Sequence, residues 1–231
     1  LRDWKHHQRL KLEKDSLGFY VSGHPLDGFA SDIRELAVTS VQLQEGDLKE
    51  QEVGSLAGIV VSKTVSLSRS SEKFAIILLE DLRGSLEFPI FARVYAQTAD
   101  LLEKGEPLLF TGRVNRRDDG MSLMVDRIRK LSHVRSEEAM NLDIWLDQEN
   151  CSPERIRMLR GMLQKYPGEI PVQMIICPNQ ESQVNIKLDE KISAHPALID
   201  EFEEERLWLK PSFHYHQTPE ILQRHSRATA Y

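Results

Sequence analysis

The stretch from residue 54 to residue 132 constrains the fold most, because five β-rich segments surround one helical segment. In chain order the β-rich segments read LAGIVVSKTVSLS, FAIILLED, GSLEFPIF, EPLLFTGRV and MSLMVDRIRKL. Between the third and the fourth lies ARVYAQTADLLEKG, which predicts a short helix that stops at Gly105. This order is that of the five-stranded oligonucleotide/oligosaccharide-binding (OB) barrel. The first segment is long enough to bend and serve both halves of a barrel, and Pro89 predicts an edge or a bulge.

The flanking residues predict two further parts, so we expect an α+β protein. Residues 1–53 are interpreted as a helical segment and a linker, because apolar residues recur at helical spacing only as far as Leu36. Residues 133–213 carry the order strand, helix, strand, strand, helix, strand, which predicts a split βαβ, ferredoxin-like domain. Residues 214–231 are polar and are expected to form a mobile tail.

The tripeptide Gly23-His24-Pro25 is the most unusual local feature of the first part. Glycine can terminate a helix, and proline is tolerated in a first turn, so the tripeptide predicts a corner where one helix stops and another starts. A catalytic His24 would need a positioned partner, and the sequence identifies none. We therefore interpret His24 as structural.

The net charge of −6 is unevenly distributed along the chain. Residues 54–132 carry 12 Lys and Arg against 10 Asp and Glu, a balance of +2. The residues before them carry 7 against 10, and the residues after them 11 against 16. Because local charge decides where a polyanion binds, the barrel is the expected place for nucleic acid.

Targeting and redox features are sparse. No apolar run approaches the roughly 20 residues of a membrane span, and no signal peptide opens the chain, so no membrane partner is expected. Cys151 and Cys177 alone cannot build a disulfide framework or a zinc site, which favours a reduced, cytoplasmic protein. The first residue is Leu1, so we expect a piece of a longer protein.

No catalytic constellation is visible in the sequence. The acidic pairs Glu80-Asp81 and Asp118-Asp119 have structural interpretations, as a strand end and a hairpin turn. His214 and His216 alternate, but two ligands do not complete a zinc site. We expect no catalytic residue, metal ligand or cofactor within these 231 residues.

Basic and aromatic residues near the two predicted loops of the barrel are the candidates for nucleic-acid binding. These loops flank the groove where single strands lie in OB folds, so their six cations are expected to converge. Phe74 is a candidate for base stacking, whereas Phe88 alternates with Leu86 and Ile90 and is expected in the core. The candidate binding residues are Lys63, Arg69, Lys73, Phe74, Arg113, Arg116 and Arg117.

The run EKDSLGFYVSGHPLDGF, residues 13–29, resembles the helical signature before the barrel of bacterial DNA polymerase III alpha subunits. The barrel segments AGIVVSKTVSLSR, LEDLRGSLEFPIF and LLFTGRVNRRDDGMSLMVDRI extend the resemblance, which covers roughly residues 10–210. It implies a non-catalytic carboxy-terminal part of a DNA-directed DNA polymerase, a nucleotidyltransferase of DNA replication. The catalytic aspartates and their Mg²⁺ would then lie upstream, outside this chain.

The resemblance also implies partners. The barrel would bind single-stranded template DNA, the terminal domain would dock on the tau subunit of the clamp loader, and the remainder of the polymerase chain would adjoin both. The first barrel loop departs from the family pattern Thr-Lys-Lys/Arg-Gly, because Ser68-Arg69-Ser70-Ser71 keeps one cation. This predicts weak binding of the template.

Two alternatives to template binding stay open. The first is a protein-docking module whose barrel holds no nucleic acid, which suits the acidic total charge. The second is a tRNA- or RNA-binding barrel from another enzyme, although the signature in residues 13–29 speaks against that.

Overall fold

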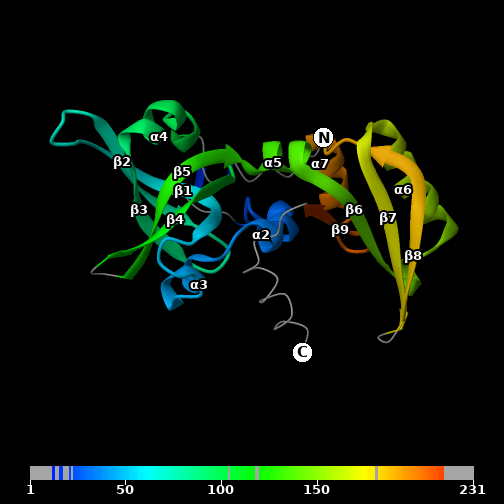
Figure 1. Cartoon of the computed structure of the whole chain (residues 1–231). Coiled ribbons are helices and arrows are strands. Elements are labelled where there is room, and N and C mark those ends of the chain that lie inside the picture. The colour runs from blue at the N-terminus through cyan, green and yellow to red at the C-terminus, as the bar shows by residue number, and fades with distance from the viewer. Residues whose placement is uncertain are drawn as a thin grey trace. The chain divides into compact units, whose positions relative to one another are not determined.

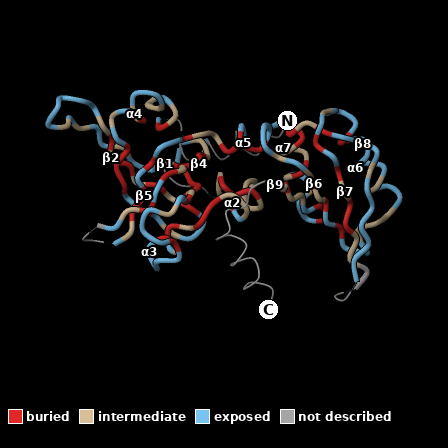
Figure 2. Tube along the Cα trace, in the orientation of Figure 1, coloured by how far each residue is buried: buried red, intermediate tan, exposed pale blue. Residues whose placement is uncertain are grey.

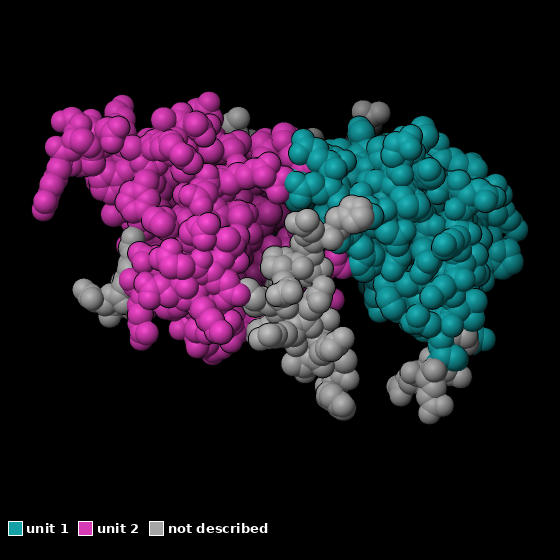
Figure 3. Space-filling view, viewed as in Figure 1, with its two compact units in different colours: residues 1–32, 134–216 teal, residues 33–133, 217–231 magenta. Residues whose placement is uncertain are grey.

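Two β-sheets, of five and four strands, organise the chain in a computed structural model (Figure 1). The structure describes residues 12–13, 16–17, 21, 23–103, 105–117, 120–179 and 182–215. They form two compact units, shown in different colours in Figure 3. Unit 1 takes its described residues from residues 1–32 and 134–216, and unit 2 from Ile33–His133. The segment interpreted as one helical piece and linker therefore contributes to both units. The expected mobile tail lies, from residue 216, outside the described residues.

Unit 2 contains the expected barrel. Its sheet has the order β3-β2-β1-β4-β5, and residues of the end strands β3 and β5 also approach each other, so the sheet closes on itself. All neighbouring strands are antiparallel. The elements are β1 (Val53–Leu67), β2 (Lys73–Glu80), β3 (Ser85–Ile90), α4 (Ala92–Thr98), η2 (Leu101–Glu103), β4 (Leu108–Arg117) and β5 (Gly120–Lys130).

The long strand β1 serves both halves of the barrel, as predicted. Its first part pairs with β4 and its second part with β2, on either side of a bulge between Val60 and Ser62. Pro89 lies in the edge strand β3, where a residue without an N–H costs no sheet hydrogen bond. Alternate residues of the strands fill the core, visible as red along them in Figure 2, and Phe88 packs edge-on against Phe110 at a centroid distance of 5.6 Å.

The predicted linker contains a helix, α3 (Ser40–Glu45), and this part of the prediction was wrong. Thr39 and Gln42 form a reciprocal capping box, and Gly46 ends the helix in the left-handed conformation. Asp81 supports it, because its carboxylate accepts hydrogen bonds from the backbone N–H groups of Ser40, Arg83 and Gly84. Asp81 therefore has the structural role expected for it.

The Gly-His-Pro corner precedes η1 (Asp27–Phe29) and α2 (Ala30–Leu36). Gly23 has a φ of 154°. The Nδ1 atom of His24 accepts a hydrogen bond from the N–H of Leu26 at 3.2 Å, and the Asp27 carboxylate accepts one from the N–H of His24 at 2.6 Å. These contacts shape the chain locally, in agreement with the structural interpretation of His24.

Unit 1 has the predicted element order after α5 (Leu131–Glu138), the helix that leads into it. The elements are β6 (Ala139–Asp147), η3 (Gln148–Asn150), α6 (Pro153–Lys165), β7 (Pro167–Asn179), β8 (Ser182–Ile192), α7 (Pro196–Glu204) and β9 (Lys210–Tyr215). The sheet order is β8-β7-β6-β9, with β6 and β7 parallel. The split βαβ prediction was therefore wrong, because β6 and β7 are direct neighbours with no strand inserted between them. Helices α6 and α7 both contribute to the core on one face of this sheet.

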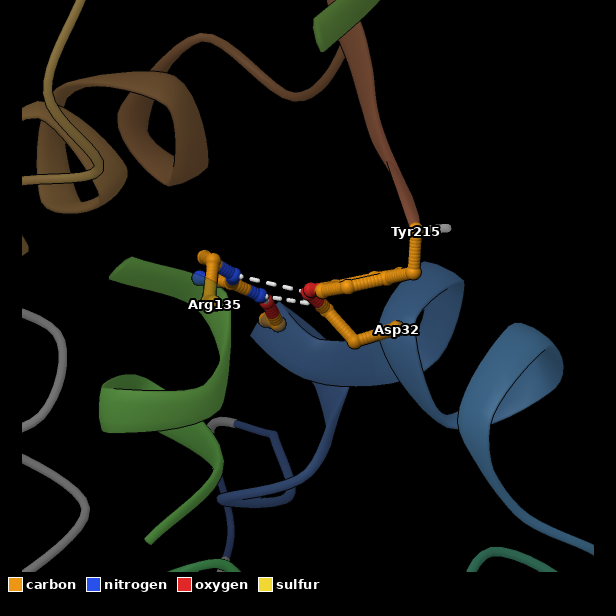
Figure 4. Close-up of polar contacts among 4 residues, drawn as sticks. Asp32, Arg135 and Tyr215 are labelled. Atoms are coloured by element: carbon orange, nitrogen blue, oxygen red, sulfur yellow. Dashed lines mark hydrogen bonds and ion pairs between the residues drawn. The ribbon is translucent and has the colours of Figure 1, made fainter. Parts of the chain in front are cut away.

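A buried polar cluster joins distant segments of unit 1 (Figure 4). The Nε atom of Arg135 donates to Oδ1 of Asp32 at 2.9 Å, and Nη2 donates to Oδ2 of Asp32 and to the carbonyl of Gly28. The hydroxyl of Tyr215 donates to the same carboxylate. Asp32 is 0% and Arg135 3% exposed.

The contacts of Arg135 favour its charged form. Burial disfavours the charge of Arg135, but Asp32 and then Tyr215 outweigh it and raise the pKa of the guanidinium. Burial, followed by the charge of Asp32, raises the pKa of Tyr215 well above its usual range. The guanidinium also lies 4.2 Å from the ring centre of Phe29 and 5.0 Å from that of Phe213.

Candidate nucleic-acid interface

The candidate residues lie near the ends of two hairpins of the barrel. The ends of the β1–β2 and β4–β5 hairpins both point to the left of Figure 1, with β3 between them. Strand β1 carries Lys63, the β1–β2 loop carries Arg69, and β2 begins with Lys73 and Phe74. Strand β4 carries Arg113 and Arg116 and ends at Arg117.

Lys63 is engaged within the barrel. Its ammonium group forms an ion pair with Glu103 at 2.8 Å and lies 5.9 Å from the ring centre of Tyr95. The hydrogen bond from Lys63, and then its charge, lower the pKa of Glu103. Only 16% of the Lys63 side chain is exposed. Phosphate would have to displace Glu103, so Lys63 is a poor candidate.

Arg113 and Arg116 do not converge. They are three residues apart in a regular strand whose side chains alternate, so they lie on opposite faces. Val114, between them, is buried in the core. Because Arg116 is two residues further along β4, it lies on the same face as Val114 but beyond the end of the core, whereas Arg113 lies on the exterior face. Both are exposed, and Arg113 donates to the carbonyl of Gln51 at 3.2 Å. Arg116 is therefore the better candidate of the two for a phosphate contact.

The β1–β2 loop is closed by its serines. The Ser68 hydroxyl accepts from the N–H of Glu72 at 3.1 Å and shares a hydrogen bond of 2.9 Å with the Ser70 hydroxyl. Ser71 has a φ of 61°, in the left-handed region that favours glycine. The loop holds Arg69 exposed at its end.

Phe74 lies on the exterior of β2, and Phe88 is 0% exposed, as the sequence predicted. Ala75, Ile77 and Leu79 alternate with the half-buried residues Phe74, Ile76 and Leu78. We call Phe74, Ile76 and Leu78 the exterior stripe. The sequence analysis did not name Ile76 and Leu78, although the register of β2 with β1 and β3 gives the segment FAIILLED an inner and an outer row.

The exterior stripe has polar neighbours. Directly opposite it on β1 are Ser62, Thr64 and Ser66, which can donate hydrogen bonds. Across from Leu78 on β3 is the exposed Glu87. The surface can thus offer apolar contacts to the faces of bases and hydrogen bonds from its hydroxyl groups. The charge of Glu87 disfavours a phosphate at the Leu78 end of the stripe.

Other chemistry is sparse in the part of the chain that the structure describes. It contains no group of three or more His, Cys, Asp or Glu residues arranged to hold a metal ion. Cys151 and Cys177 are free thiols, and burial, followed by the charge of Asp147, raises the pKa of Cys151. His214 lies 3.0 Å from Asp143, and His216 is outside the described residues. Within the same ranges, no helix combines the length and apolarity needed to cross a membrane.

Comparisons with known proteins agree with this geometry. Residues 55–131 match a family model described as an OB-fold nucleic acid binding domain. DNA polymerase III subunit alpha of Pseudomonas fluorescens is 26% identical over 211 residues, 88% of this chain and 18% of the relative. The subunit of Neisseria meningitidis serogroup B is 27% identical over 206 residues, 87% of this chain and 18% of the relative. The chain is a homologue of DNA polymerase III subunit alpha. This confirms the resemblance drawn from residues 13–29 and the barrel segments.

The DNA polymerase III alpha homology covers only part of those relatives, since this chain spans about a fifth of their length. A solved domain of replication protein A from Methanococcus maripaludis is similar to 41% of the chain, at 16% identity and a TM-score of 0.29.

Proposed function

We propose that this chain is a non-catalytic part of a replicative DNA polymerase whose barrel binds single-stranded template DNA. The observation that carries the proposal is the exterior stripe of an OB barrel, half-exposed beside the basic residues Arg69 and Lys73. Apolar side chains contact unpaired bases, and the cations contact phosphates. Homology to DNA polymerase III subunit alpha supplies the replicative context.

The cation count supports weak binding. Lys63 is neutralised by Glu103, and Arg113 faces away from Arg116, so few cations remain for one strand. A strand that contacts few phosphates binds with modest affinity that falls as salt is added.

Replacing Arg116 with alanine tests the barrel. We expect weaker binding of a labelled oligothymidylate and a salt dependence flatter by about 0.7, the contribution of one phosphate contact to a single strand. The measurement is fluorescence anisotropy at several salt concentrations. Arg157→Ala, at an exposed position of α6 in unit 1, changes the net charge equally and should bind like the parent chain.

Two results would contradict this assignment. If Arg157→Ala flattened the salt dependence as much as Arg116→Ala, total charge and not the barrel would explain binding. If the folded parent chain bound no DNA at low salt, the barrel would be a protein-docking module, the alternative that its neutralised Lys63 favours.

We also propose that unit 1 docks on the tau subunit of the clamp loader, a partner implied by the family resemblance. Deleting residues 216–231 should weaken capture by immobilised tau and leave oligonucleotide affinity unchanged. The deletion must spare β9, because Phe213 is in the core and Tyr215 binds Asp32. Undiminished capture by the shortened chain would assign docking to residues 134–215 instead.

A further inference from the structure

Strand β8 is an open edge of the four-stranded sheet of unit 1. In the order β8-β7-β6-β9 it pairs with β7, and the residues that the structure describes put no strand on its other side (Figure 1). It is 11 residues long. Alternate N–H and C=O groups of an edge strand point away from the sheet, so they can pair with a strand of another chain.

The two edges of this sheet differ in the features that prevent such pairing. The other edge strand, β9, has 6 residues and contains Pro211, which has no N–H to offer a further strand. In β8 the comparable features lie in its C-terminal part. Four charged residues occur from Lys187 to Lys191, and the register with β7 shifts there. The preceding residues, 182–186, are exposed and uncharged, so this stretch of the edge is unprotected.

Two exposed apolar side chains lie in the unprotected stretch. Val184 is 48% and Ile186 37% exposed. They lie opposite Ile176 and Met174 of β7, and directly opposed residues of an antiparallel pair share a face of the sheet. Met174 is part of the core of unit 1, and Ile176 packs against that core. Val184 and Ile186 therefore extend the apolar face of the sheet to its edge, where a further strand would cover them.

The segment Gln183–Lys187, which we call the open segment, is complementary to a second copy of itself. If two copies pair antiparallel about a two-fold axis at Asn185, Val184 of each lies opposite Ile186 of the other. In the same register Gln183 lies opposite Lys187, so the one charge of the segment meets a neutral amide. Asn185 meets Asn185 of the second copy, and an amide both donates and accepts hydrogen bonds. This register pairs all five residues and opposes no like charges.

We propose that the open segment of β8 is a self-association surface through which two copies of this chain pair edge to edge. The inference is independent of the proposed DNA binding and tau docking. Main-chain hydrogen bonds supply the affinity, and the contacts between Val184 and Ile186 fix the register. An interface of one strand pair is small, so we expect a weak dimer that forms as the concentration rises.

Sedimentation velocity of the 231-residue chain at increasing concentrations measures the association. We expect the parent chain to pass from monomer to dimer. Ile186→Lys should raise the dimer dissociation constant by about tenfold or more, because it adds a cation to the apolar row beside Lys187. Leu207→Lys is the matched control, since Leu207 is 90% exposed elsewhere in unit 1 and the same charge is added. It should dimerise like the parent chain.

A cysteine at the two-fold axis tests the register. Opposed residues have Cβ atoms about 5 Å apart, within reach of a disulfide, so Asn185→Cys should form a covalent dimer when diamide oxidises the thiols. Gln183→Cys is the control, because four residues, about 13 Å of strand, separate its position from that of its copy. The parent chain gives the background from Cys151 and Cys177, which are free thiols.

Three results would overturn the inference. The first is a parent chain that remains monomeric at every concentration. The second is an equal loss of association in Leu207→Lys, or equal cross-linking of Gln183→Cys, since either would exclude the open segment as the specific contact. The third is a monomeric parent chain that dimerises once residues 216–231 are removed, because the edge would then be covered by the chain itself and not by a second copy.

Discussion

Replacing Arg135 with alanine is expected to lower the free energy of unfolding of unit 1 by about 3–5 kcal/mol. The reason is that Asp32, which is 0% exposed, would stay buried without its ion-pair partner. Tyr215 still donates to it but cannot supply a countercharge. The carbonyl of Gly28 would also lose a donor.

Urea unfolding followed by tryptophan emission measures this change. The described tryptophans, Trp145 and Trp208, both lie in unit 1, so their signal reports on that unit. The control is the double variant Asp32→Leu/Arg135→Met, which removes both charges and should lose less stability than Arg135→Ala alone. A loss below about 1 kcal/mol for Arg135→Ala, a value typical of exposed pairs, would show that the cluster is solvated in solution.

Gly112→Ala is expected to destabilise the barrel by about 3 kcal/mol or more, because the added methyl group has no room. A Cβ atom at Gly112 would lie 2.1 Å from the backbone oxygen of Met124 on the neighbouring strand. Backbone cannot rotate away as a side chain can. The clash falls where the β4–β5 register shifts, so relief requires the hairpin that carries Arg116 to move.

Hydrogen exchange of the β4 and β5 amides measures the loss, and the tryptophan signal of unit 1 should be unaffected. Gly161→Ala is the matched control, since a Cβ atom at this exposed helical position meets nothing within 4 Å. It should stabilise α6 by about 0.5–1 kcal/mol. If Gly112→Ala exchanged as slowly as the parent, the close approach of β4 and β5 would not exist in solution.

Local sequence patterns predicted the helices and strands better than they predicted which strands lie side by side. The bend of β1, the edge position of Pro89 and the burial of Phe88 follow from strand length, a missing donor and alternation. Helix α3 was missed even though Thr39 and Gln42 carry capping-box residues, because a polar helix of six residues has no apolar period. The order β8-β7-β6-β9 was not predictable, since element order does not state which strands pair.

The sequence predicted which kinds of residue make up the candidate site, but only partly which of them lie on the same face of the barrel. Phe74 could be named because it starts a β-rich segment beside cations, and the structure puts it on the exterior. Arg113 and Arg116 are three residues apart, so the alternation of a strand already puts them on opposite faces, and the expectation that all six cations converge overlooked this. The partner of Lys63 is 40 residues away, and that of Arg135 is 103 residues away, so no local pattern could reveal either.

Unit 1 is interrupted in the sequence by Ile33–His133, the described residues of unit 2, and this has a consequence for synthesis on the ribosome. Asp32 emerges about 100 residues before Arg135 and 183 residues before Tyr215. All residues of the barrel are synthesised before Arg135, so the barrel can fold first. Until Arg135 and Tyr215 have been synthesised, Asp32 remains exposed to water. A gene cut to begin at residue 134 would make every strand of the second sheet and leave Arg135 without its acid.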